Sequence, residues 1–352
     1  LIAGFGFSVL VMLLAVGLSI WELGEVRKVS ARLSNLRTPT AEASLEMLNG
    51  INHSLAALRG YILLGKDRFK TERLKAWTEE ISPSLQKMVV LSEKWTNPEN
   101  QVRLAQIEKK VALFKRSQQE IEAVARTPEN RPDLLLAEGE LDEIGTLMLS
   151  KVAALIDLER VRTANDVNIT LFSSMADFRG SLAMMQTSLL AYLLTGKDLH
   201  KANFVKQNAI NTTSFESLKT HLSAMSSEQQ QGYKVISQAY KDFLPLAEQI
   251  FLLRERANYD IANYWLATKA APLAFEIRDV NRAKVDSQEA LRENDFDSLQ
   301  LKISSITSME YMLLISGCLV AIIASSFYIR SLISSFARVK TITDAIAKGD
   351  LT

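Results

Sequence analysis

The sequence has few of the residues that many functional classes need. Its 352 residues include one cysteine, three histidines, seven prolines and 14 glycines. One cysteine excludes a disulfide framework, and so few scattered histidines exclude a Cys/His zinc site. The 41 basic residues nearly balance the 40 acidic ones, so the chain lacks the basic excess of a nucleic-acid binder. With little proline or glycine to form turns, we expect long regular elements.

The chain does have two uncharged apolar runs, one near each end. Residues 1–21 carry no charge, and residues 311–329 read YMLLISGCLVAIIASSFYI. Each is close to the ~20 residues that a helix needs to cross a bilayer. Trp21, Tyr311 and Tyr328 lie at the run ends, where aromatic rings favour lipid headgroups. A buried core helix is the alternative for either run. A signal peptide is a further alternative for the first, but no small-residue cleavage site follows it.

Basic residues after the second run indicate the orientation of the predicted membrane helices. Arg330, Arg338 and Lys340 precede the first acidic residue, Asp344, and such an excess marks the cytoplasmic side. Residues 22–310 are then expected on the opposite side of the membrane.

The middle segment shows helical periodicity and no sustained strand-like alternation. Apolar residues recur three and four positions apart in two seams, Leu48, Ile51, Leu55, Leu58 and Ile62, and then Met175, Phe178, Leu182, Met185, Leu189 and Tyr192. Such heptads predict helices packed at shallow angles. No proline occurs between residues 133 and 194, so we expect one long helix there, which suits two stacked bundles better than one.

A ten-residue motif occurs twice, 131 positions apart. Residues 58–67 read LRGYILLGKD and residues 189–198 read LLAYLLTGKD. Each copy predicts a helix that ends at a glycine, Gly65 or Gly196, which can adopt the left-handed cap conformation. The aspartate that closes each copy is expected to cap the following helix. The repeat predicts two homologous modules.

The first copy, Arg-Gly-Tyr, three apolar residues and Gly-Lys-Asp, resembles the helix-end signature of extracellular sensor domains in bacterial chemoreceptors and sensor kinases; the second has Leu190-Ala191 in place of Arg-Gly. Two copies between two membrane spans resemble the helical bimodular sensor domain, over residues 22–310. The ending Ile-Ala-Lys-Gly-Asp-Leu makes residues 330–352 similar to the first helix of a HAMP relay. The resemblance implies an all-α fold of two stacked four-helix bundles built from about six long helices, flanked by two transmembrane helices.

The resemblance also implies a function and partners. It implies the sensing and signalling module of a methyl-accepting chemotaxis protein, a homodimer in the bacterial inner membrane whose sensor domain is periplasmic and contacts no nucleic acid. Its expected partners are membrane lipid, a small organic-acid-like ligand and a downstream cytoplasmic signalling domain. One alternative is the input module of a sensor histidine kinase, which can read a periplasmic binding protein. Another is a membrane-anchored coiled-coil adaptor without a ligand.

Nothing in the sequence predicts catalysis. It contains no HExxH pair, no phosphate-binding glycine loop and no nucleophile–base spacing. His53, His200 and His221 lie too far apart in the sequence to suggest a metal site. We therefore expect no enzyme activity, no cofactor and no metal.

A binding site for a small anion is the more plausible function. A buried anion needs a cation and hydrogen-bond donors. Pairs of polar residues seven apart flank each seam, with a tyrosine nearby, and give six candidates: Asn52, Arg59, Tyr61, Arg179, Gln186 and Tyr192. The alternative is that the polar residues are solvated and only flank the seams. Acid-binding members of the family carry arginine where this chain has Leu55 and Leu58, which argues against a dicarboxylate.

Overall fold

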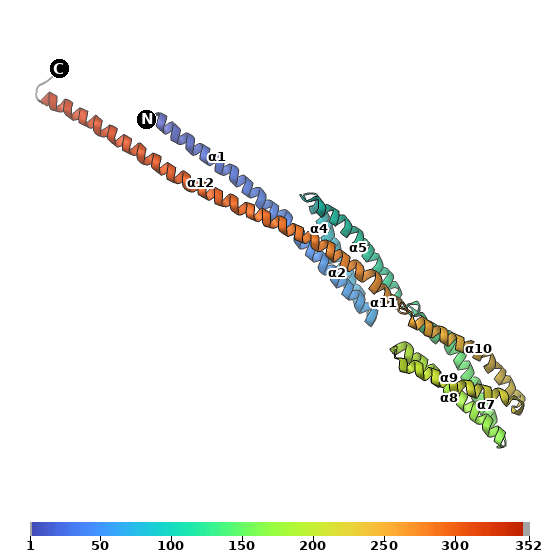
Figure 1. Cartoon of the computed structure of the whole chain (residues 1–352). Coiled ribbons are helices and arrows are strands. Elements are labelled where there is room, and N and C mark those ends of the chain that lie inside the picture. The colour runs from blue at the N-terminus through green and yellow to red at the C-terminus, as the bar shows by residue number, and fades with distance from the viewer. Residues whose placement is uncertain (1, 348–352) are drawn as a thin grey trace. The chain divides into compact units, whose positions relative to one another are not determined.

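The chain is all-α, as predicted. The computed structural model describes residues 2–347, and every regular element in that range is a helix (Figure 1). The α-helices are α1 (Ile2–Arg32), α2 (Thr38–Leu64), α3 (Arg68–Lys75), α4 (Ser82–Ser92), α5 (Pro98–Val124), α6 (Pro132–Leu136), α7 (Asp142–Arg160), α8 (Asp166–Thr195), α9 (Asp198–Thr220), α10 (Ser227–Glu255), α11 (Ile261–Trp265) and α12 (Ala271–Ala347). Short π-helical turns η1 (Leu33–Arg37), η2 (Ala76–Ile81), η4 (Ala137–Leu141) and η6 (Leu266–Ala270), and 3-10 turns η3 (Pro128–Asn130) and η5 (Leu222–Ala224), lie between them.

The helices form two compact units. The first unit comprises Leu1–Ile51, Ala76–Lys109 and Ile277–Thr352, and the second comprises Asn52–Lys75 and Lys110–Glu276. Both copies of the repeated motif lie in the second unit, because α2 crosses the division before its copy begins. The division therefore does not assign one copy to each unit.

Helices α7, α8, α9 and α10 share one hydrophobic core in the second unit. All six residues of the predicted seam on α8, from Met175 to Tyr192, are buried there. Aromatic rings fill the centre: the ring centroids of Phe215 and Tyr240 lie 4.3 Å apart, and that of Phe178 lies 5.9 Å from Phe215. The seam on α2 is also buried, except for half-buried Leu48. The heptads therefore predicted the core faces correctly.

Both motif glycines end their helices as predicted. Gly65 and Gly196 have φ values of 66° and 68°, a region that L-residues with a Cβ rarely occupy. The amide of Gly65 donates to the Tyr61 carbonyl at 2.8 Å, and that of Gly196 donates to the Tyr192 carbonyl at 2.7 Å. The expected aspartate cap is wrong for the second copy, because Lys197 occupies the cap position and Asp198 is already the first residue of α9.

An arginine side chain from a later helix or loop donates a hydrogen bond to a backbone carbonyl near each of these helix ends. Arg126 Nη2 donates to the Tyr61 carbonyl at 3.4 Å, and Arg254 Nε donates to the Leu193 carbonyl at 3.2 Å. Cationic donors are favoured here because the last carbonyls of a helix have no partner within the helix and form its negative end. Both copies of the motif thus end in the same left-handed cap with an arginine at the terminal carbonyls.

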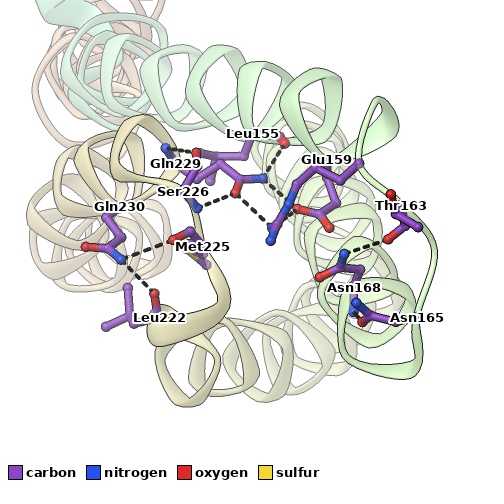
Figure 2. Close-up of polar contacts among 11 residues, drawn as sticks. Leu155, Glu159, Thr163, Asn165, Asn168, Leu222, Met225, Ser226, Gln229 and Gln230 are labelled. Carbon is purple, nitrogen blue, oxygen red and sulfur yellow. Dashed lines mark hydrogen bonds and ion pairs between the residues drawn. The ribbon is translucent and has the colours of Figure 1, made fainter.

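The prediction of one long helix after residue 133 is wrong, because the chain turns between α7 and α8. Asn165 starts α8 by accepting a hydrogen bond from the Asn168 amide at 2.8 Å, and the Asn168 side chain donates to the Thr163 carbonyl at 2.8 Å (Figure 2). A side-chain cap can begin a helix without proline or glycine, so the absence of those residues misled the prediction.

Buried polar contacts tie the end of α7 to the start of α10. Ser226 and Gln229 form a capping box at α10, and Gln229 Nε2 donates to the Glu159 carboxylate at 2.7 Å (Figure 2). Arg162 donates to the same carboxylate at 2.9 Å. Both bonds end on the same oxygen, Oε2, of a residue that is only 4% exposed, and the other oxygen, Oε1, is buried without a hydrogen-bond partner in the described part of the chain.

Three prolines lie near the starts of helices that follow wide turns. The π-helical turns η1, η2 and η6 come immediately before the helices that carry Pro39, Pro83 and Pro272 near their starts. Proline cannot donate a backbone hydrogen bond, and its ring displaces the carbonyl four residues earlier. A widened turn accommodates that displacement without ending the helical path.

One helical span in the described range is long and apolar enough to cross a membrane. It runs over Ile261–Asp344, and none of its apolar window is buried, unlike the core helix of a soluble protein. α1 carries the other uncharged run, with Leu13 and Ile20 64% and 65% exposed. The end of the HAMP-like stretch, residues 348–352, lies outside the described residues.

The helix-end glycines give a test of the fold. Gly196→Ala should lower the free energy of unfolding by about 1 kcal/mol or more, because a Cβ is strained at positive φ and would lie 3.1 Å from Arg254 Nη2. Gly180→Ala is the matched control: no neighbouring atom lies within 4 Å of its added Cβ, so better helix propensity should raise stability by about 0.5–1 kcal/mol. Thermal melting followed by circular dichroism compares them. Equal effects of the same sign would contradict the assigned cap.

Candidate ligand-binding site

The six residues predicted from the sequence, three in or beside each copy of the motif, differ in exposure and in their contacts. Asn52, Arg59 and Arg179 are exposed, so these three lie as the solvated alternative describes. Gln186 is half-buried, and its Nε2 packs on α7 where a Cβ at Gly145 would lie only 2.1 Å away. Gln186 thus fills a close helix–helix contact.

The two motif tyrosines are buried in apolar and cationic surroundings. Tyr61 is 5% exposed and Tyr192 is 7% exposed. Lys70 Nζ lies 4.6 Å from the centroid of the Tyr61 ring, and the ring centroids of Tyr192 and Phe251 lie 5.4 Å apart. The tyrosines are buried near the ends of their helices, whereas Arg59 and Arg179 are exposed. A ligand role for these six residues stays a prediction.

A shallow groove of about 400 Å³ lies on the second unit along α10 and η5. None of the predicted residues lines it; its lining is Leu222, Ser223, Gln230, Tyr233, Lys234, Ser237, Gln238 and Lys241. Lys234 and Lys241 are exposed, so their charges are already solvated. An anion there would gain little from desolvated contacts.

The first unit contains a more unusual feature, a row of polar residues inside its core. On α12 the buried residues Asn281, Lys284, Gln288 and Asp295 follow one another at spacings of three, four and seven, which are positions of a single heptad face. Buried residues from η1 and α2 face this row, as do residues from α4 and the segment before α5. We call this set the polar core; its other members are Arg37, Thr40, Ser44, Met88, Trp95 and Thr96.

At one end of the polar core, charges are paired. Arg37, whose side chain is 3% exposed, donates to Asp295 at 3.2 Å. Its other nitrogens donate to the Gln288 side-chain oxygen at 3.2 Å and to Thr96 Oγ1 at 3.1 Å. Arg32 adds a hydrogen bond to Asp295 at 2.9 Å. Burial by itself would raise the pKa of Asp295, but hydrogen bonds from Arg32 and Arg37 outweigh it and hold that pKa below its usual value.

Lys284 has no such partner. Its side chain is fully buried, with Nζ against the Met88 sulfur and 5.6 Å from the centroid of the Trp95 ring. No carboxylate in residues 2–347 forms an ion pair with it. Burial lowers the pKa of Lys284 to about 7, because the charged form loses its hydration without gaining a counter-ion.

The amides beside Lys284 also have unused hydrogen-bonding atoms. Asn281 Nδ2 donates to the Ser44 carbonyl at 3.0 Å, but its Oδ1 is buried without a partner. Gln288 accepts from Arg37, but its Nε2 is buried without a partner. Buried polar atoms are nearly always satisfied, so two orphans flanking an uncompensated amine mark a place suited to a ligand. An ammonium and an amide N–H can together hold a small anion.

Sequence reasoning missed this site. The signal was present, since four polar residues recur at heptad spacing between positions 281 and 295, ahead of the second apolar run. Spacing alone does not distinguish a solvated polar face from a buried one, and packing against α2 and α4 shows that this face is internal. Neither the family models nor the curated proteins that were searched match this chain.

The charge pair at Asp295 gives a stability prediction. Asp295→Asn should lower the free energy of unfolding by about 3 kcal/mol, because it leaves Arg37 buried without a counter-ion. The aspartate stabilises the fold above its unfolded pKa of about 3.9, and this contribution is lost as pH falls through the lower folded pKa. The deficit of the variant should therefore shrink below about pH 4.

Chemical denaturation of both proteins at several pH values provides the measurement. The control is Glu216→Gln, whose partner Lys219 lies 3.3 Å away in a pair that is 59–60% exposed; its effect should stay within about 1 kcal/mol. A variant at Asp295 as mild as this control would contradict the buried pair.

Proposed function

We propose that the chain is the input half of a two-pass transmembrane receptor of the bacterial chemoreceptor type. In this proposal the polar core binds a small anion outside the cytoplasmic membrane, and α12 carries the signal inward. The observation that supports it best is the continuity of α12, which holds both Lys284 and the apolar run 311–329 in one unbroken helix.

A continuous helix is a suitable carrier for such a signal. Lys284 lies 27 residues before Tyr311, or about 40 Å at 1.5 Å per residue. A helix has no hinge to absorb a shift unless its hydrogen-bond ladder is broken, and α12 has no break within Ala271–Ala347. An anion that binds one packing of α12 better than another would therefore favour one of two positions of the helix at residue 330, where the apolar run ends. The bias is limited by the difference between the two affinities.

Dimer formation is part of the proposal. Between the polar core and the apolar run, Phe296, Leu301 and Ile303 are 50%, 73% and 48% exposed on α12 in the single chain. Apolar side chains on a helix that leaves its bundle are suited to packing against a second copy of that helix. The orientation rests on the basic residues that follow position 329.

The alternative of a ligand-free adaptor fits the polar core less well. A structural coiled coil is more stable with an apolar residue than with an unpaired lysine at a core position. A buried amine without a counter-ion in the chain is consistent with a site where the anionic ligand supplies that counter-ion. The sensor-kinase alternative shares this input mechanism and differs only in the output domain.

A thermal-shift screen tests ligand binding. Small organic acids, amino acids and amines are added to the chain in detergent, and we expect at least one acid to raise the Tm by several degrees near 100 times its Kd. Lys284→Met should abolish that shift, whereas Lys241→Met in the exposed groove should leave it unchanged. Equal stabilisation of wild type and Lys284→Met would place the ligand elsewhere, and a screen with no shift at all would favour the adaptor.

Cysteine labelling tests the topology. The free Cys318 is replaced by serine, and single cysteines are introduced at Lys197 and Ser335. In right-side-out spheroplasts a membrane-impermeant maleimide should label Lys197→Cys, but should label Ser335→Cys only after permeabilisation. Labelling of both positions without permeabilisation would contradict the two-pass arrangement.

A further inference from the structure

We infer that the polar core binds a monovalent anion only when Lys284 is protonated, so that above neutral pH the anion must bring a proton with it and the receptor responds strongly only under neutral to acidic conditions. This inference rests on the proposed function and names the regulation of its site.

The surroundings of Lys284 favour a neutral amine when no anion is bound. From α12 it is flanked by the amides of Asn281 and Gln288, and from α4 by Met88. The only carboxylate in the polar core, Asp295, lies 11 residues further along α12, about 16 Å away along the axis, and it is already held by Arg32 and Arg37.

The remaining charge near Lys284 is of the same sign. Arg37 donates to the Gln288 side-chain oxygen, so a guanidinium stands behind the amide that neighbours Lys284. From α2 the facing side chains are Thr40 and Ser44, which are uncharged, and before α5 they are Trp95 and Thr96. The Trp95 ring, 5.6 Å from Nζ, gives a positive charge on Lys284 one weak attraction. No anionic group of the described chain lies beside Lys284, and the Arg37 guanidinium disfavours the charge.

An anion changes this balance. A neutral amine presents a lone pair, which repels an anion, whereas an ammonium presents three N–H donors. Binding is therefore written as neutral Lys284 plus the anion plus a proton from hydronium or a buffer acid, giving an ammonium–anion pair; one N–H bond forms as the donor's bond to that proton breaks, and the donor's conjugate base stays in solution. Gln288 Nε2 is the unused donor beside the pair, and Asn281 Oδ1 is an unused acceptor for the third ammonium proton.

The coupling predicts how affinity depends on pH. Because burial brings the pKa of Lys284 to about 7, the free site is mostly protonated at pH 6 and mostly neutral at pH 8. The apparent Kd for an anion should be about tenfold weaker at pH 8 than at pH 6, and about 100-fold weaker at pH 9. The anion stays ionised over this range, so the change belongs to the protein.

Calorimetry tests the coupling directly. Acetate is titrated into the full chain in lipid nanodiscs at pH 6, 8 and 9, and at pH 8 in two buffers of different ionisation enthalpy. The expected result is the weakening given above, with close to one proton taken up per acetate at pH 8. Acetate binding with the same Kd at pH 6 and 9 would overturn the coupling alone and leave the proposed sensor intact. No binding of acetate at pH 6 would overturn the anion site and the coupling together.

Two variants separate the role of Lys284 from a general effect of pH. Lys284→Arg keeps its charge throughout this range, so acetate affinity should remain but lose its pH dependence. Lys284→Met allows a test by protein stability, which needs no added ligand. The lysine has a lower pKa folded than unfolded, so wild-type stability should rise with pH from about 7 towards 10 relative to Lys284→Met. Parallel stability curves for wild type and Lys284→Met would show that Lys284 does not titrate as proposed.

Discussion

Burial of charge in a helical core is the constraint that the first unit must satisfy. An ionised group loses its hydration inside a bundle and must find partners there or become neutral. Arg37 and Asp295 meet this requirement with each other, with Arg32 and with neutral donors and acceptors around them. Lys284, on the same face of α12, does not. The contrast between a satisfied pair and an unsatisfied amine in one core gives the proposed site its chemistry, because an arriving anion supplies what Lys284 lacks.

In the second unit the main structural requirement is different: the terminal backbone carbonyls and amides of long helices need hydrogen-bond partners. Its two repeated motifs each stop a helix at a left-handed glycine, with an arginine at the terminal carbonyls. At other ends a capping box and buried carboxylate contacts do the same task. The sharing of one core by α7 to α10 then depends on apolar seams, with aromatic rings at the centre.

The six binding residues proposed from the sequence show what a spacing pattern leaves undetermined. Arg59 and Arg179 flank seams that are buried as predicted, yet both point to solvent. The apolar stripe of a helix is about 100° wide. A polar residue beside that stripe is buried only if a neighbouring helix also covers its side. Heptads specify which face is inside but not how far the cover extends. Lys284 was overlooked because it shares a polar helix face with Asn281 and Gln288, and spacing alone does not show that other helices cover that face.

The sequence by itself determined the helical class, the two apolar seams and the left-handed glycine ends, because these depend on local spacing and on the steric limits of single residues. It also located the apolar run that α12 carries. The tertiary structure decided which polar residues are desolvated, since burial depends on helices brought together from distant parts of the chain. It likewise decided that the chain turns at Asn165, where a side-chain hydrogen bond does what proline or glycine does elsewhere.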